Sequence, residues 1–103
     1  MPMYVHATIK IKPGKIFQAY ELLGHIVPEM EKAGWKLLGA YQGVVGETST
    51  IVDIWEVADA NAVPALMASL ATNPKMAEFG PKLLDLMAQE EFLQLMVKAP
   101  YSP

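Results

Sequence analysis

Apolar and polar residues alternate strictly along residues 4–11, a pattern typical of a β-strand with one buried face. One side carries Val5, Ala7, Ile9 and Ile11. The other side carries Tyr4, His6, Thr8 and Lys10. After a turn at residues 12–15 the spacing becomes helical, and the apolar residues Ile16, Tyr20, Leu23, Val27 and Met30 share one helix face up to Gly34. Pro28 should make this helix irregular.

Residues 35–45 and 48–57 are predicted strands, joined by a two-residue turn at Gly46-Glu47. This turn sets residue 40 opposite 53, 38 opposite 55 and 41 opposite 52. Asp53 and Trp55 then share a face with Leu38 and Ala40, while Tyr41, Val52 and Ile54 occupy the other.

The second half repeats the order of strand, helix and strand. Asp59 is the predicted N-cap of a helix through Val63 and Leu70, which Asn73-Pro74 interrupts and Gly80-Pro81 breaks again. Residues 90–97 form the last predicted strand, with Glu90-Glu91 as solvated residues where it begins. The order βαββαβ predicts an α+β, ferredoxin-like domain over residues 1–103, whose four-stranded antiparallel sheet has its helices on one face.

Both faces of the predicted sheet carry apolar or aromatic residues, although the helices of so small a domain can cover only one. Hydrophobic residues make up 52% of the 103 residues and charged residues 18%. Such a composition favours burial of the second face against another copy of the chain. We therefore expect a homodimer, with room for a higher oligomer.

The charged residues narrow the choice of ligand. The net charge is −3, all eight basic residues are lysine, and cysteine is absent. Arginine is the usual reader of phosphate and guanine, so its absence weighs against nucleic acid and against a tightly held anion. No metal-ligand spacing is present, and no cofactor is expected, although a lone histidine could hold haem. No apolar stretch is long enough to cross a membrane, and the first residues lack a signal-peptide pattern, so we expect a cytoplasmic protein.

Five segments follow one another in a recognisable order: the strand and turn at 8–15 (TIKIKPGK), residues 34–41 (GWKLLGAY), Val45-Gly46, residues 52–56 (VDIWE) and Asn73-Pro74. Together they resemble the NIPSNAP family of the dimeric α+β barrel superfamily. The chain departs from the family's pattern at Asp53, where histidine is common, at Tyr41, where tryptophan is common, and at Val57, where tyrosine is common. It also lacks an arginine early in the second helix.

The resemblance implies a dimer whose two sheets pack back to back, with a small-molecule pocket between each sheet and its own helices or at the barrel rim. It does not imply one reaction, because the superfamily includes cofactor-free monooxygenases, cyclases, isomerases and haem-handling proteins, alongside members without known chemistry.

The candidate catalytic pair is His6 with Asp53. If Val52 and Ile54 meet the helices, His6 and Asp53 share the opposite face of neighbouring strands, where the carboxylate would orient a histidine base. A β-bulge near Gly43 would bring Tyr41 to that face. Tyr4, Tyr41, Trp55 and Met96 are the candidate substrate-binding residues.

Each of these residues also has a structural interpretation. Asp53 and His6 can be hydrogen-bonded residues of a dimer interface, Tyr41 and Trp55 can serve packing, and the methionines can fill gaps in the core. Two hypotheses follow. One is a cofactor-independent enzyme acting on a small hydrophobic or aromatic metabolite, and the other is a non-catalytic dimeric module that binds a small molecule or a protein.

Overall fold

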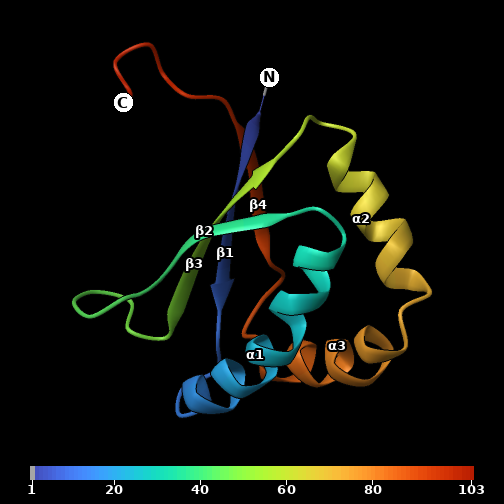
Figure 1. The fold of residues 1–103 in the computed structure, drawn as a ribbon. Coiled ribbons are helices and arrows are strands. Elements are labelled where there is room, and N and C mark those ends of the chain that lie inside the picture. The colour runs from blue at the N-terminus through green and yellow to red at the C-terminus, as the bar shows by residue number, and fades with distance from the viewer. Residues whose placement is uncertain (1) are drawn as a thin grey trace.

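Within residues 2–103, the part of the chain that the computed structural model describes, four antiparallel strands form one sheet and three helices lie along one of its faces (Figure 1). The elements follow the chain as β1 (Met3–Lys10), α1 (Ile16–Lys32), β2 (Lys36–Gln42), β3 (Thr50–Val57), α2 (Ala62–Ala71), α3 (Pro74–Leu86) and β4 (Phe92–Met96). The strand order β2-β3-β1-β4 makes β1 and β3 central. The predicted ferredoxin-like α+β fold is confirmed.

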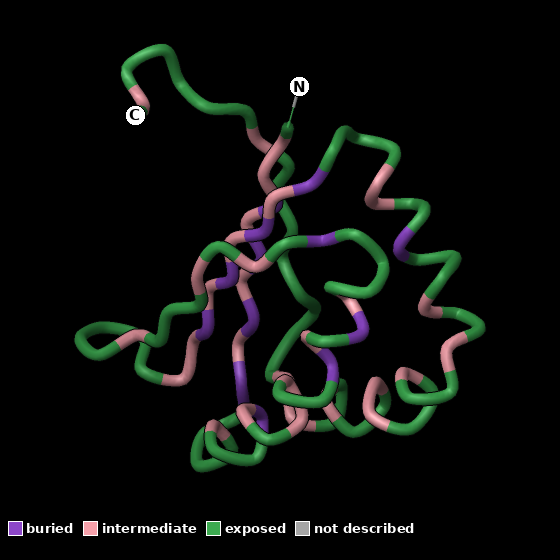
Figure 2. Tube along the Cα trace, in the orientation of Figure 1, coloured by how far each residue is buried: buried purple, intermediate pink, exposed green. Residues whose placement is uncertain are grey.

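The core lies between the central strands and the helices. Figure 2 shows buried residues alternating along β1 and β3, as expected where only one sheet face is covered. One cluster gathers around Trp35, Trp55 and Leu66, and a second gathers around Ile9 and Ala19. The alternation predicted for the first strand therefore identifies its buried face correctly, with Val5, Ala7 and Ile9 towards the helices.

The hairpin between β2 and β3 differs from its prediction. Both strands are shorter than predicted, and residues 43–49 form the loop between them, so the two-residue turn is wrong. At Gly43 a Cβ atom would lie 1.9 Å from the Glu47 carbonyl oxygen, so the chain passes too close for a side chain. The Glu47 carboxylate accepts hydrogen bonds from Thr50 and Lys10, which hold the end of the loop against the sheet.

The register is correct at one end of this hairpin and shifted at the other. Ala40 pairs with Asp53 and Tyr41 with Val52, as predicted. The irregularity lies at Leu38 rather than near Gly43, and it places Leu37 opposite Trp55. Leu37 then packs into the core, whereas the extra residue, Leu38, is exposed.

Two helix boundaries also correct the sequence predictions. The Asp59 carboxylate accepts the backbone N–H of Asn61 in the turn before α2, so it does not cap the helix. Pro81 does not break α3, which continues from Pro74 to Leu86. Proline removes one backbone hydrogen bond, and the packing of Leu83 and Leu86 against the core beneath α1 outweighs that loss. The predicted break at Asn73-Pro74 is confirmed as the boundary between α2 and α3.

Candidate functional site

A cavity of about 330 Å³ lies between the helix-covered face of the sheet and the three helices. Apart from two carboxyl groups, its walls are apolar side chains from the sheet and from each helix. The lining consists of Ala7, Ile9, Leu23, Ile26, Val27, Met30, Trp35, Asp53, Trp55, Leu66, Met67, Leu70, Met76, Gly80, Pro81, Leu83, Leu84, Met87, Glu91 and Leu93. Met67, Leu84 and Leu93 are also exposed, so they mark where the cavity opens to solvent.

Asp53 places a carboxyl group deep in this apolar space. It lies in the middle of β3, opposite Ala7 of β1 and Ala40 of β2, and only 5% of it is exposed. Two alanine neighbours leave room for the carboxyl group on the helix side. Burial raises the pKa of Asp53 to about 6, and among residues 2–103 no group donates a hydrogen bond to it.

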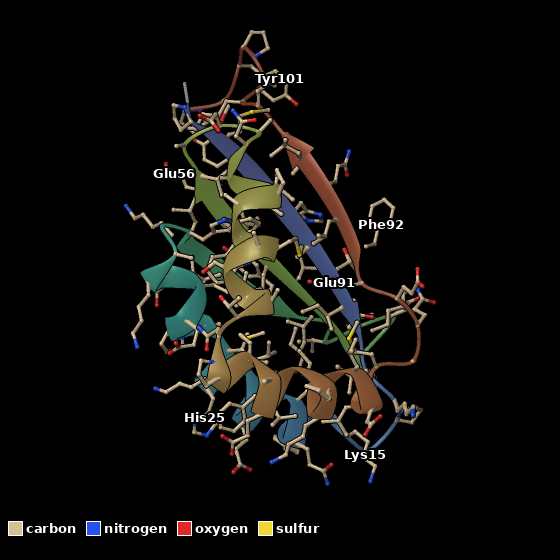
Figure 3. The ribbon with its side chains drawn as sticks, turned by 90° about the vertical axis from the view of Figure 1, so that its right-hand side faces the viewer. Lys15, His25, Glu56, Glu91, Phe92 and Tyr101 are labelled. Atoms are coloured by element: carbon tan, nitrogen blue, oxygen red, sulfur yellow. The ribbon has the colours of Figure 1, made fainter. Side chains whose placement is uncertain are left out.

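Glu91 lines the same cavity from the segment just before β4. In Figure 3 the ring of Phe92 projects away from the helices, whereas Glu91 lies on the other side of the strand. The residue keeps contact with solvent while its carboxyl group faces the cavity. Its partial burial, and then the charge of Asp53, raise the pKa of Glu91. The charge of Asp53 therefore acts on Glu91 across the cavity.

A second buried carboxylate shows what Asp53 lacks. Glu29 of α1 is only 7% exposed, yet Asn73 donates to it at 3.2 Å and Lys32 and Lys75 lie within 3.6 Å. The hydrogen bond from Asn73, with that from Lys32 next, lowers the pKa of Glu29. Buried charges in folded proteins normally have such partners, and Asp53 is the exception in this molecule.

The expected pairing of His6 with Asp53 is wrong within one chain. Ala7 is the residue opposite Asp53, whereas His6 pairs with Ile54 and with Gln94 of β4. His6 therefore lies on the open face of the sheet, together with Tyr4 and Met96, and none of these three lines the cavity. The prediction assumed that Val52 and Ile54 meet the helices, but their neighbours Ile51, Asp53, Trp55 and Val57 do so.

The two remaining candidates lie on opposite faces. Trp55 is buried, packs edge-to-face on Trp35 with ring centroids 5.9 Å apart, and contributes to the cavity wall. Tyr41 is 61% exposed on the open face, where its ring covers Gly39, and it borders a second cavity of about 240 Å³ that Asp53 also reaches. The main cavity thus brings together Asp53 and Trp55, the second cavity brings Asp53 near Tyr41, and His6 lines neither.

The sequence interpretation missed Glu91. Adjacent glutamates at the start of a strand are expected to be solvated, and both are exposed, but Glu91 also lines the cavity whereas Glu90 does not. The missed signal is the alternation that follows, because Glu91 has the same parity as Leu93 and Leu95, the residues opposite Ala7 and Val5. Continuing that pattern backwards predicts that Glu91 faces the helices.

Residues 2–103 contain two histidines and no cysteine. No group of three or more histidine, cysteine, aspartate or glutamate side chains is placed to hold a metal ion there. Neither histidine lines the cavity, since His6 is on the open face and His25 stacks on Phe79 at 4.4 Å on the outer side of the helices (Figure 3). Nor is any helix in this part of the chain long and apolar enough to cross a membrane.

Comparison with known proteins places the fold. The NIPSNAP family model matches residues 4–103. A NIPSNAP family protein from Agrobacterium tumefaciens str. C58 has a TM-score of 0.89 at 17% identity, with 100% of this chain and 98% of that chain covered. An uncharacterized NIPSNAP domain protein from Burkholderia xenovorans has a TM-score of 0.84 at 19% identity, with 98% of each chain covered.

A putative antibiotic biosynthesis monooxygenase from Bordetella bronchiseptica is similar at a TM-score of 0.77 and 11% identity, with 95% of this chain and 97% of that chain covered. A search of curated proteins gave no match. At these identities the solved structures show a shared fold and leave the chemistry of the cavity to its own residues.

Proposed function

The chain belongs to the NIPSNAP family, and on this premise we propose that it binds a small, largely apolar molecule in the cavity between its sheet and its helices. The proposal takes residues 1–103 as one domain, which the family match over residues 4–103 supports. The observation that carries it is a buried carboxyl group, Asp53, without a protein partner in an otherwise apolar cavity. Ligand sites typically combine such walls with a few polar groups and volumes of about 300–1,000 Å³.

The proposal includes a homodimer formed through the open sheet face. In the described part of the chain no helix covers this face, and it carries half-buried Tyr4, His6 and Met96 beside Tyr41 and Phe92, which are 61% and 60% exposed. Packing two such faces together would bury these aromatic rings. His6 would then be an interface residue. A cytoplasmic location stays a prediction from the sequence.

Proton transfer without a cofactor is the chemistry that this cavity supports best. A carboxyl group with a pKa of about 6 holds or releases a proton close to neutral pH, which suits a general acid or base. Asp53 would be that group, Glu91 at the mouth would exchange its proton with solvent, and Trp55 would position an aromatic substrate. An isomerase, cyclase or cofactor-free monooxygenase would fit, and similarity in fold to the putative monooxygenase supports this group of reactions.

The alternative is binding without catalysis. It shares the same cavity and the same ligand, and it differs only in that Asp53 would hold the ligand rather than transfer a proton. A turnover assay on each ligand found, repeated on Asp53→Asn, distinguishes them. Turnover that Asp53→Asn abolishes supports the enzyme, and binding without turnover supports the module.

The binding site itself is tested with a matched pair of glycine variants. Gly80 of α3 lines the cavity, and a Cβ atom there would meet only the end of the flexible Met76 side chain, at 3.9 Å, so Gly80→Leu should fill the cavity. Gly24 of α1 is also helical, but it lies outside the lining with nothing within 4 Å. Small neutral aromatic molecules such as 2-phenylethanol are titrated while the fluorescence of Trp35 and Trp55, the chain's two tryptophans, is followed.

Ligands that bind in the cavity should change the fluorescence of the wild type, Gly24→Leu and His6→Ala, but not that of Gly80→Leu. Equal binding to Gly80→Leu, or no binding of any aromatic probe, neutral or charged, to the wild type, would overturn the proposed site. Loss of binding in His6→Ala would place the site on the open face instead.

A further inference from the structure

We propose that the molecule bound in this cavity is a hydrophobic organic cation, such as a primary amine, whose protonated nitrogen sits between the carboxyl groups of Asp53 and Glu91. The inference rests on the proposed binding function and adds the charge of the ligand to it. Its hydrocarbon part would lie against the apolar walls formed by the helices and by Trp55.

The first argument is the carboxyl group of Asp53, which has no protein partner and is accessible from the cavity. Only 5% of the residue is exposed, and among residues 2–103 its carboxyl group has no hydrogen-bond partner. Glu29, which is buried to a similar degree, has an amide and two ammonium groups around it. The same chain therefore pairs one buried carboxylate fully and leaves the other facing an empty space. A partner from outside would complete Asp53 in the way that Asn73 and Lys32 complete Glu29.

The second argument is the charge balance of the cavity. Two carboxyl groups line it, while none of the eight lysines, all of which lie within residues 2–103, does so, and the chain has no arginine. Two like charges in a poorly solvated space repel each other, and a cation between them replaces repulsion with two attractions. A neutral ligand would leave that repulsion in place, and an anion would increase it.

The third argument is the distribution of polar and apolar surface. Asp53 marks the inner end at the sheet and Glu91 marks the solvent side, and every other lining side chain in the described part of the chain is apolar. Met67, Met76 and Met87 contribute flexible side chains that adapt to different hydrocarbon shapes. The lining thus matches an amphiphile with one cationic group and a compact hydrocarbon body.

The pH dependence follows from the same geometry. The groups that face Asp53 from neighbouring strands are Ala7 and Ala40. The helix residues that line the main cavity are uncharged, and in residues 2–103 Glu91 is the other titratable residue of that lining. The second cavity that Asp53 borders is also lined by Tyr20 and Tyr41. Below a pH of about 6 the Asp53 carboxyl group is protonated and loses its attraction for a cation. An alkylamine stays protonated throughout this range, so its affinity should fall with the ionisation of Asp53 and Glu91 alone.

The test compares three probes of one shape by isothermal titration calorimetry on the full chain. The probes are 2-phenylethylamine as the cation, 2-phenylethanol as the neutral molecule and 3-phenylpropanoate as the anion. At pH 7.5 the amine should bind about tenfold or more tightly than the alcohol, since hydrogen bonds to a charged group add roughly 1.5–3 kcal/mol, and the anion should bind most weakly. At pH 5 the preference for the amine should fall by about tenfold.

Three variants locate the charge. Asp53→Asn should lose the preference for the amine while still binding the alcohol, and Glu91→Gln should lose part of it. Glu90→Gln is the matched control, because Glu90 is exposed like Glu91 but lies outside the cavity lining, and it should behave as the wild type.

The outcomes separate this inference from the proposed function. If the alcohol binds as tightly as the amine, or if Asp53→Asn keeps the preference, the cationic ligand is wrong while the binding cavity stands. If no probe of any charge binds to the wild type, both fail. If Glu90→Gln lowers amine affinity as much as Glu91→Gln does, the effect is general electrostatic attraction, and the site between Asp53 and Glu91 is wrong.

Discussion

Asp53 lies directly opposite Ala7 across β3 and β1, and this pairing turns its carboxyl group towards the helices. A residue with a larger side chain than Ala7 would fill the space that the carboxyl group faces. The chain instead keeps a small neighbour on each side of Asp53 and surrounds the resulting cavity with apolar residues. A buried carboxyl group without a protein partner reduces stability, so we expect a functional reason for its presence.

The first prediction concerns the stability of Asp53→Asn as a function of pH. Because the folded-state pKa of Asp53 is raised from 3.8 to about 6, the carboxyl group is best tolerated below pH 3.8, and its contribution to stability is lost as the pH rises through about 6. We therefore compare the free energy of unfolding of Asp53→Asn with that of the wild type at two pH values. After allowance for water in the cavity, the difference should favour the variant by about 1–2 kcal/mol more at pH 8 than at pH 4. Urea unfolding at equal protein concentration measures this difference, and a gain that does not change between the two pH values contradicts it.

The second prediction concerns the loop between β2 and β3. Gly43→Ala should lower the free energy of unfolding by about 1–3 kcal/mol, because the new Cβ atom would meet the backbone oxygen of Glu47 at 1.9 Å. Gly24→Ala is the control, since nothing lies within 4 Å of its Cβ position and alanine favours the helix by roughly 0.5–1 kcal/mol. Urea denaturation of both variants provides the measurement. Equal stabilities would mean that the loop moves aside without cost.

The third prediction concerns the junction between α2 and α3. The Asn73 side chain accepts the backbone N–H groups of Lys75 and Met76, and it donates to Glu29 of α1. Asn73→Ala should therefore cost about 1–2 kcal/mol in thermal or urea unfolding. The control is Thr72→Ala, at the residue before Asn73, which removes one exposed hydrogen bond to the Ser69 carbonyl. Its free energy of unfolding should stay within about 0.5 kcal/mol of the wild-type value. A similar cost for both variants would show that Asn73 has no special role in capping.

The fourth prediction concerns assembly. Phe92 on the open sheet face is 60% exposed, and Phe17 on α1 is 80% exposed. If dimers form through the sheet, Phe92→Glu should weaken the dimer by about tenfold or more, because it places a charge in the interface. Phe17→Glu should leave the dimer intact. Sedimentation equilibrium measures both, and a wild-type monomer, or a dimer that responds only to Phe17→Glu, would place the interface elsewhere.

The sequence predicted the fold well because the signals for it are local. The alternation around Val5 and Ala7, the helical spacing after Ile16 and the break at Asn73-Pro74 each depend on neighbouring residues. The correct pairings of Ala40 with Asp53 and of Tyr41 with Val52 show that strand register can follow from position along a hairpin even when the turn itself is wrong.

The candidate site was harder to predict, because it depends on which face of β3 meets the helices. Val52 and Ile54 look like core residues, and Asp53 between them looks like a surface residue. The pairing of β3 with β1 reverses that choice, because Ala7 on the buried face of β1 lies opposite Asp53. Glu91 joins Asp53 from a segment 38 positions further along the chain, and only tertiary structure places both in one cavity.

The most direct test of the account is a carbon-13 NMR titration of the Asp53 side-chain carboxyl group, with and without 2-phenylethylamine. Without the amine the pKa should be about 6, and bound amine should lower it because the cation stabilises the carboxylate. An ordinary pKa near 3.8 that the amine does not change would contradict the account, because it would show that Asp53 is already solvated or paired and that the cavity has no need of a ligand.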